Sequence, residues 1–146
     1  MSWNNISDGE RLRLWKNLRD NIKSLPLDEQ LTEIVSFCDT MPRGSRTLDY
    51  YSPDDWPSPW EILFHGSFCI SSVSLLMFYT LTLFPNEKKL DLILVEDASA
   101  GIHLLLVVND QFVLNYHYNT ISKLDEIGPE FIILKQYKQS EVKPVK

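Results

Sequence analysis

A cysteine at the predicted start of a helix is the side chain of this sequence best suited to covalent chemistry. Cys69 opens the most apolar run of the chain, residues 68–84, and with Ser67 as N-cap it would be the second residue of its helix. Backbone N–H groups at that end have no helical acceptors, and the helix dipole is positive there. Both features favour a thiolate and could hold an oxyanion beside the sulfur. Position alone fits equally well a small apolar residue packed under a sheet.

A nucleophilic cysteine needs a base, and the sequence offers three histidines. His103 is the only polar side chain in the strand candidate 102–108, and we predict it as the general base; a hydrogen-bonded structural histidine is the alternative. His65 lies across a predicted helix break from Cys69 and is expected on the surface. A metal site formed by Cys69, His103 and His117 is a third possibility, but it lacks the paired-cysteine spacing of zinc sites. We therefore expect no metal and no cofactor.

The base in turn needs a partner for its second ring nitrogen, which fixes its tautomer and direction. Asn115 is the candidate, because it is the only amide flanked by apolar residues in the next strand candidate, 111–117. Residues directly opposite each other on antiparallel strands share a face. His103 faces Asn115 if Val107 pairs with Gln111, which requires a connecting loop of odd length or a bulge.

Two helices are predicted before residue 42. Ser7 and Glu10 form a capping box at the start of the first, and Pro26 suits the first turn of the second. Cys38 lies on the apolar stripe of the second helix, so we expect it in the core. The apolar positions at helical spacing are Leu12, Leu14, Trp15, Leu18 and Ile22 in the first helix and Leu31, Ile34, Val35, Cys38 and Met41 in the second.

Residues 42–57 are predicted to form a loop rich in aromatic and turn-forming residues. Loops of this length in a compact domain are often functional, and a plain connector is the alternative. Ser58 and Glu61 then form a second capping box, with Pro59 in the first helical turn. The side chains expected to bind a substrate, or to anchor a partner, are Tyr50, Tyr51, Trp56 and Trp60. The buried face of the helix after Cys69 would carry Ile70, Val73, Leu76, Met77 and Thr80 or Leu81.

The pattern changes after Pro85 from helical to strand periodicity. Four strand candidates follow, at 90–96, 102–108, 111–117 and 131–137. Helices first and an antiparallel sheet afterwards predict an α+β domain. We predict one domain over 1–138, with helices in 1–41, a loop at 42–57, helices with Cys69 in 58–84, a sheet of about four strands in 90–137, and a frayed polar tail at 139–146.

The charge balance and the cysteine count exclude some classes of function. A formal net charge of -6 and a pI near 5.0 argue against binding to a nucleic-acid backbone, which takes a basic face. Two cysteines are too few for a disulfide framework, and the first residues lack the apolar region of a signal peptide. The apolar run 68–84 is too short and too rich in Ser and Thr for a convincing membrane span. We expect a cytoplasmic protein with no nucleic-acid or membrane partner.

The order helix-start cysteine, strand histidine, next-strand Asn resembles the transglutaminase-like, or papain-like, cysteine peptidase superfamily, and small bacterial and phage members in particular. The stretches that carry the resemblance are WPSPWEILFHGSFC and HLLLVVNDQFVLNY, and it covers about residues 50–120. It implies a helix packed on an antiparallel sheet, with Cys69 as nucleophile, His103 as general base and Asn115 as orienting residue. Asn115 stands where the family more usually has Asp, and no acidic residue follows Cys69, where bacterial relatives often have one.

Two functions follow, and the sequence favours the first. One is a cysteine-dependent hydrolase or acyltransferase that acts on an amide, peptide or thioester bond through the Cys69, His103 and Asn115 triad, with a peptide or protein as its substrate. The other is a non-catalytic protein-interaction module on the same fold, encoded by a phage or a bacterium. The sequence indicates neither the substrate and acceptor nor the oligomeric state.

Overall fold

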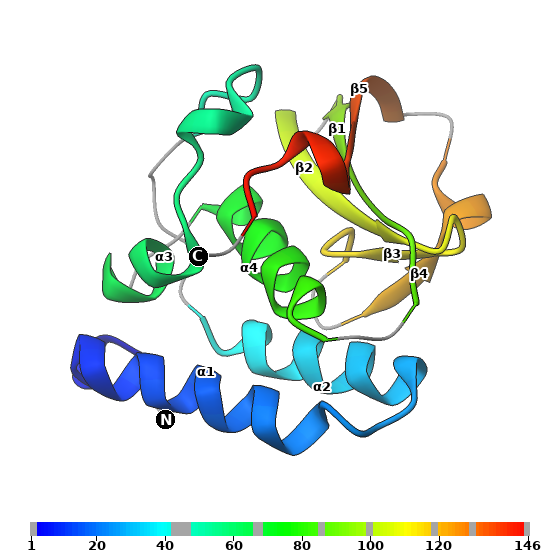
Figure 1. Cartoon of the computed structure of the whole chain (residues 1–146). Coiled ribbons are helices and arrows are strands. Elements are labelled where there is room, and N and C mark those ends of the chain that lie inside the picture. The colour runs from blue at the N-terminus through cyan, green and yellow to red at the C-terminus, as the bar shows by residue number, and fades with distance from the viewer. Residues whose placement is uncertain are drawn as a thin grey trace.

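Helices pack on an antiparallel sheet in the computed structural model, which confirms the predicted α+β class (Figure 1). The structure describes residues 3–41, 48–65, 69–84, 87–98, 101–117, 120–128 and 131–144. The helices are α1 (Asp8–Ile22), α2 (Leu27–Asp39), α3 (Pro59–His65) and α4 (Ile70–Thr82). The strands are β1 (Leu90–Asp97), β2 (Gly101–Val108), β3 (Phe112–Leu114), β4 (Ile121–Lys123) and β5 (Phe131–Lys138). Short 3-10 turns are η1 (Trp3–Asn5), η2 (Pro53–Asp55), η3 (Leu124–Glu126) and η4 (Gln139–Glu141).

The serines of the two predicted capping boxes cap their helices as expected, while the Glu10 carboxylate pairs with Arg13. Ser7 Oγ accepts a hydrogen bond of 3.2 Å from the Glu10 amide at the start of α1. Ser58 Oγ accepts one of 3.2 Å from the Glu61 amide, and Glu61 Oε1 accepts the Ser58 amide at 3.4 Å, which makes a reciprocal box before α3. Pro26 is the N-cap of α2 and lies just before its first turn.

The sheet has five strands, in the order β4-β3-β2-β1-β5, whereas about four were predicted. The strand missing from the prediction is β4, which is only three residues long and gives little periodicity. β3 is also shorter than the predicted 111–117, because Asn115 adopts a left-handed conformation with φ of 73° and ends the strand at Leu114.

The β2–β3 hairpin has a loop of the predicted odd length but a different register. Val107 pairs with Val113 and not with Gln111, so the strands are offset by two residues from the expectation. The loop therefore consists of residues 109–111. Asn109 and Asp110 both have positive φ, at 56° and 54°, and these are residue types that tolerate the left-handed region in turns.

Helix α4 lies between the sheet and the other helices, and it is buried on every side (Figure 1). Residues 71–81 are all buried, so the predicted inward face is confirmed except at Ile70, which is 44% exposed. The sheet residues that share this core are Leu90, Leu92, Leu94, Leu104, Leu106, Val108, Leu114 and Tyr137. None of the described helices has the length and apolarity needed to cross a bilayer.

The opposite face of the sheet has its own smaller apolar cluster. The alternate strand residues Ile93, Val95, Leu105, Val107 and Val113 form it. The side chains that pack over it are Tyr116, Leu124, Ile127 and Phe131, which belong to the segments after β3 and to the start of β5. Both faces of the sheet are therefore covered, as the two apolar faces of its central strands predict.

A frayed tail was predicted from residue 139 onward, but within the described residues 139–144 the turn η4 and Val142 attach it to the core. Val142 is only 5% exposed and belongs to the main core. Glu141 Oε1 accepts a hydrogen bond of 3.2 Å from the Lys138 amide and closes the turn η4. The polar composition of the tail gave no indication that Val142 is buried in the core.

Candidate functional site

Cys69 is the N-cap of α4, whereas it was predicted to be the second residue of a helix capped by Ser67. Ser67 lies outside the described residues. Its backbone is extended, with φ of -81° and ψ of 167°. Its Sγ accepts a hydrogen bond of 3.4 Å from the Ser72 amide and lies 3.1 Å from Ser72 Oγ. The thiol is half-buried, whereas Cys38 is in the core as predicted. Cys69 is thus held by the free N–H groups of a helix start and remains accessible.

His103 lies in β2, and its side chain points to the face of the sheet away from α4. Leu105 and Val107, two and four residues further along β2, belong to the apolar cluster of that face. Its cross-strand partner Val95 belongs to it too. The imidazole meets the ring of Phe131 edge-on, with 6.3 Å between ring centroids.

The imidazole of His103 is buried, and its Nδ1 has no hydrogen-bond partner among the described residues. Burial lowers the pKa of His103, and the negative charge of Asp97 and a hydrogen bond with the Gly101 backbone oppose this shift only in part. The environment therefore favours a neutral, structural histidine.

Asn115 reaches α4 and not His103. Its Nδ2 donates hydrogen bonds of 2.7 Å to the carbonyl oxygen of Ile70 and 2.8 Å to Ser74 Oγ. A regular strand would have placed Asn115 opposite Leu105, on the face of His103. The positive φ of Asn115 turns its side chain to the helix side instead.

The structure therefore brings together two of the three predicted triad residues. Cys69 and Asn115 both lie at the first turn of α4. His103 lies on the other side of the sheet, and the β2 residue that precedes it on the α4 side is Ile102, because Leu104 shares the α4 core and side chains alternate along a strand. The role of Cys69 as a nucleophile stays a prediction.

The other two histidines lie on the surface. His65, in the last turn of α3, is exposed and meets Phe64 edge-on, with 5.7 Å between ring centroids. His117 is exposed and stacks on Tyr116 at 4.2 Å. Neither histidine has a hydrogen bond to Cys69 among those between described residues.

The four aromatic residues predicted to bind a substrate have different positions. Trp56 is a core residue at 2% exposure, and its Nε1 donates a hydrogen bond of 2.8 Å to the Asp49 carbonyl oxygen, so it cannot anchor a partner. Trp60 is 40% exposed and packs on the buried Trp15. Tyr51 is exposed, and Tyr50 is half-buried with its hydroxyl 3.1 Å from the Ile102 carbonyl oxygen.

The serines of α4 are the site residues that the sequence reading missed. Ser71 Oγ accepts the Leu104 amide at 3.1 Å and donates to Tyr50 Oη at 3.2 Å. Ser74 Oγ donates to the Leu104 carbonyl oxygen at 2.8 Å. Hydroxyls inside an otherwise apolar helix were the available signal, because buried polar groups need partners. They fix the start of α4 against β2.

No family model matches this chain, and no curated protein matches it. Three solved structures of LapG from Legionella pneumophila are similar to it. One has a TM-score of 0.71 at 19% identity and covers 89% of this chain and 74% of that chain. A calcium-bound one has a TM-score of 0.68 at 17% identity, over 96% and 92%. An EGTA-treated one has a TM-score of 0.72 at 19% identity, over 89% and 73%.

This likeness shows the fold, which is the transglutaminase-like α+β fold of LapG. The resemblance to small phage members stays a prediction. One LapG structure is calcium-bound, but within the described part of this chain no group of three or more His, Cys, Asp or Glu side chains could hold a metal ion. Cys69, His103 and His117 are not such a group either.

Proposed function

We propose that this chain is a protein-interaction module that holds a peptide or protein segment at the α4 mouth, the surface formed by Cys69, Ile70 and Ile102. The observation that carries the proposal is the direction of His103, whose imidazole lies on the sheet face away from α4. A cysteine nucleophile needs a base within hydrogen-bond reach. On the face of β2 that points to α4, the residue next to His103 is Ile102, which is apolar and cannot act as a base.

Exposed apolar side chains at the α4 mouth support a binding role. Ile70 in the first turn of α4 and Ile102 at the start of β2 are 44% and 40% exposed. Tyr50 and Ser71 connect the two elements through the hydrogen bonds to Ile102 and Leu104. An apolar surface on a rigid, hydrogen-bonded frame is typical of an interaction site.

Cys69 itself favours a second candidate, a cysteine-dependent hydrolase or acyltransferase on an amide or thioester bond. The half-buried thiol accepts a hydrogen bond from the Ser72 amide, and the fold is shared with LapG. The sulfur would lose its proton to a base and attack the carbonyl carbon, and the N–H groups at the start of α4 would hold the oxyanion. Collapse would expel the protonated amine or thiol, and water or an amine would then release the acyl group. The predicted triad would require β2 to present His103 on its other face.

Thiol labelling separates the two candidates if it measures whether the reactivity of Cys69 depends on His103, and not only how fast Cys69 reacts. Cys69 should react with iodoacetamide faster than Cys38 in either case, because Cys38 is buried. For a module, we expect His103→Asn to leave the labelling rate of Cys69 unchanged within about twofold, since the two side chains are on opposite faces. Peptide mapping by mass spectrometry gives both rates in one sample.

The activity arm of the experiment uses a mixture of synthetic heptapeptides and their thioesters. For a module, mass spectrometry finds no cleavage product and no acyl adduct on Cys69. Turnover that Cys69→Ala and His103→Asn both abolish, together with slower labelling of Cys69 in His103→Asn, would overturn the module and establish the enzyme.

A further inference from the structure

Three exposed side chains form a row across the sheet near the α4 mouth. Glu96 of β1 pairs with Ile102 of β2 on one side and with Ile132 of β5 on the other. Cross-strand partners share a face, and neighbouring strands are about 4.8 Å apart, so the row is a continuous strip of surface. Side chains two residues apart on a strand share a face. Leu94 is two residues before Glu96 and Leu104 two after Ile102, and both belong to the α4 core, so the row lies on the α4 side.

The apolar members of this row are unusually open for a sheet face. Ile102 is 40% exposed and Ile132 is 57% exposed, whereas Leu94 and Leu104 are completely buried. Ile102 and Ile132 are therefore accessible at this end of the sheet. β5 is an edge strand of the sheet, so the strip is open toward β5 as well.

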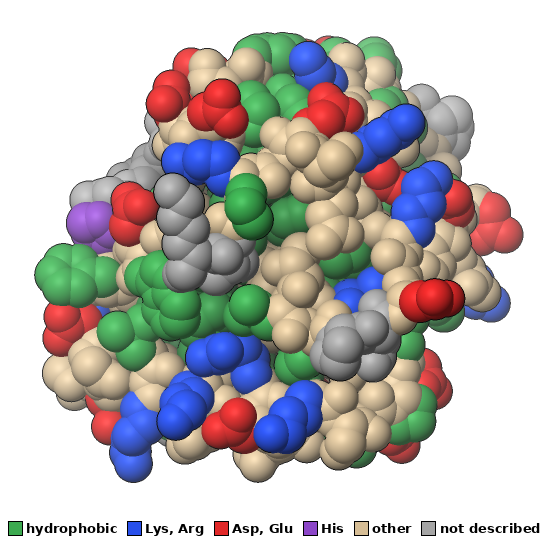
Figure 2. Space-filling model, in the orientation of Figure 1, with side chains coloured by type: hydrophobic (Ala, Val, Ile, Leu, Met, Phe, Trp, Pro, Cys, Tyr) green, Lys and Arg blue, Asp and Glu red, His purple; other side chains and the backbone are tan. Residues whose placement is uncertain are grey.

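The charge within the row itself is negative. Glu96 is exposed between the two isoleucines, and the segment that carries Tyr51 adds the exposed Asp49, Asp54 and Asp55. Lys135, the nearest cation on β5, lies one row further in, with its Nζ 5.1 Å from the ring centroid of Tyr137. Figure 2 shows green apolar surface at the top of the molecule, with both red acidic and blue basic side chains around it.

We infer that the row Ile102, Glu96 and Ile132 is the specificity surface of the α4 mouth, and that it binds an extended peptide segment with apolar residues next to Lys or Arg. The apolar side chains of the peptide would cover Ile102 and Ile132, and its cation would pair with Glu96 between them. A second copy of this chain is a poor occupant, because each copy has a net charge of -6 and brings Glu96 against Glu96. This inference deepens the proposed function and rests on it.

The test measures peptide binding by fluorescence anisotropy with three labelled probes of equal length. They are Gly-Lys-Ile-Lys-Ile-Lys-Gly, Gly-Glu-Ile-Glu-Ile-Glu-Gly and Gly-Lys-Ser-Lys-Ser-Lys-Gly. We expect the first probe to bind at least tenfold more tightly than the other two. Glu96→Lys should reverse the preference between the first two probes, and Ile132→Ser should weaken the first by at least fivefold.

Ile133 provides a matched control. It follows Ile132 in β5 and is equally exposed at 58%, but it pairs with Val95 and so lies on the opposite face. Ile133→Ser should leave binding unchanged within about twofold. Equal losses in Ile132→Ser and Ile133→Ser would overturn the inference, because binding would then follow the general apolarity of the edge strand.

The remaining outcomes separate this inference from the proposed function. If the acidic probe binds and Ile102→Ser abolishes this binding, the preference for cations is overturned and the α4 mouth remains a binding site. Failure of all three probes to bind at millimolar concentration would count against both. Circular dichroism of each variant identifies any loss that comes from unfolding.

Discussion

Asn115 Nδ2 lies 2.7 Å from the carbonyl oxygen of Ile70 and 2.8 Å from Ser74 Oγ, so one carboxamide group joins the end of β3 to the first turn of α4. This contact replaces the pairing with an imidazole that a catalytic triad would need. The residue that was predicted to orient a base therefore orients a helix. Asn115 holds the start of α4 to the end of β3, and the hydrogen bonds of Ser71 and Ser74 with Leu104 hold it to β2.

Substitution of Asn115 should destabilise the fold in two separable steps. Asn115→Gly removes both hydrogen bonds but tolerates the φ of 73°, and we expect the free energy of unfolding to fall by about 1–3 kcal/mol. Asn115→Ala should cost about 1 kcal/mol more, because the left-handed conformation is unfavourable for a residue with a Cβ atom. Urea denaturation measures both values. Equal stability of the two variants would show that residue 115 leaves the left-handed region once the hydrogen bonds of the asparagine are lost.

Arg11 is expected to be a strong determinant of stability, because its buried guanidinium closes the end of α3. Its three nitrogens donate to the carbonyl oxygens of Leu63, Phe64 and Ile6 at 2.7 Å each and to that of Trp3 at 3.3 Å. Arg11→Met leaves these carbonyls without their donor, and we expect a loss of about 3 kcal/mol in the free energy of unfolding.

Arg13 is the matched control for Arg11 on the same helix. It is exposed, and its ion pair among the described residues is the one with Glu10 on the same helix, so Arg13→Met should leave the urea midpoint close to that of the wild type. If both arginine variants unfolded at the same urea concentration, the hydrogen bonds of Arg11 would contribute no more than a surface pair.

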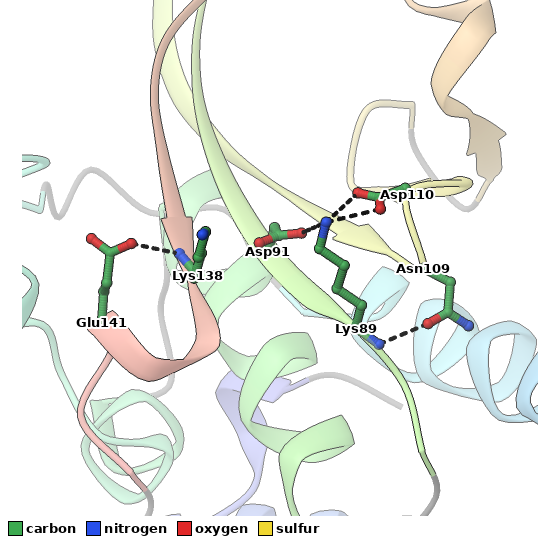
Figure 3. Close-up of polar contacts among 6 residues, drawn as sticks. All are labelled: Lys89, Asp91, Asn109, Asp110, Lys138 and Glu141. Atoms are coloured by element: carbon green, nitrogen blue, oxygen red, sulfur yellow. Dashed lines mark hydrogen bonds and ion pairs between the residues drawn. The ribbon is translucent and has the colours of Figure 1, made fainter.

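Lys89 and Asp91 should be energetically coupled, and a double-mutant cycle can measure this. Within the described part of the chain, the buried Asp91 carboxylate has no hydrogen bond. Lys89 Nζ lies 3.7 Å from its Oδ2 and 2.8 Å from Asp110 Oδ2 (Figure 3). Lys89→Met removes the nearby cation and leaves the buried charge uncompensated, so it should lower the urea midpoint. In an Asp91→Asn background the same change should cost much less. Additive effects would show that Asp91 is neutralised by another group, such as its cross-strand neighbour Lys138.

The helices and the core were predictable because short, local signals determine them. The boxes at Ser7 and Ser58 act within one helical turn, and the apolar stripe with Cys38 needs only helical periodicity. Burial of Trp56 was not predictable in this way, since its partners Asp49 and Tyr137 are joined to it only by the tertiary fold. Val142 is a similar case, because one apolar residue in a polar tail has no pattern.

The candidate site was predictable in its members but not in their directions. Cys69 at a helix start and Asn115 near a strand end were identified from residue type and position, and both lie at α4. A shift of one residue along β2 would move the His103 side chain to the other face of the sheet. The direction of Asn115 depends on a backbone conformation outside the strand region. Neither property can be read from composition, and together they decide whether a triad forms.

His103 should make the stability of the fold depend on pH in the acidic range. Burial lowers its pKa in the folded state below the ordinary value of about 6.5, so the unfolded chain binds more protons between the two values. Stability should be complete above pH 6.5 and should fall as the pH decreases through that value towards the folded pKa. Urea denaturation from pH 5 to pH 8 measures the slope.

His103→Leu should flatten this pH dependence, because Val95 and Leu105 offer the new side chain apolar neighbours and its charge is gone. Relative to the wild type, the variant should gain stability at pH 5 and change little at pH 8. His117→Gln is the matched control, since His117 is exposed and its replacement should keep the slope of the wild type. A slope that survives in His103→Leu would mean that another group carries it. If His103 acted as the base of Cys69, the rate of thiol labelling should also change over this pH range. The same pH series therefore helps to decide between module and enzyme.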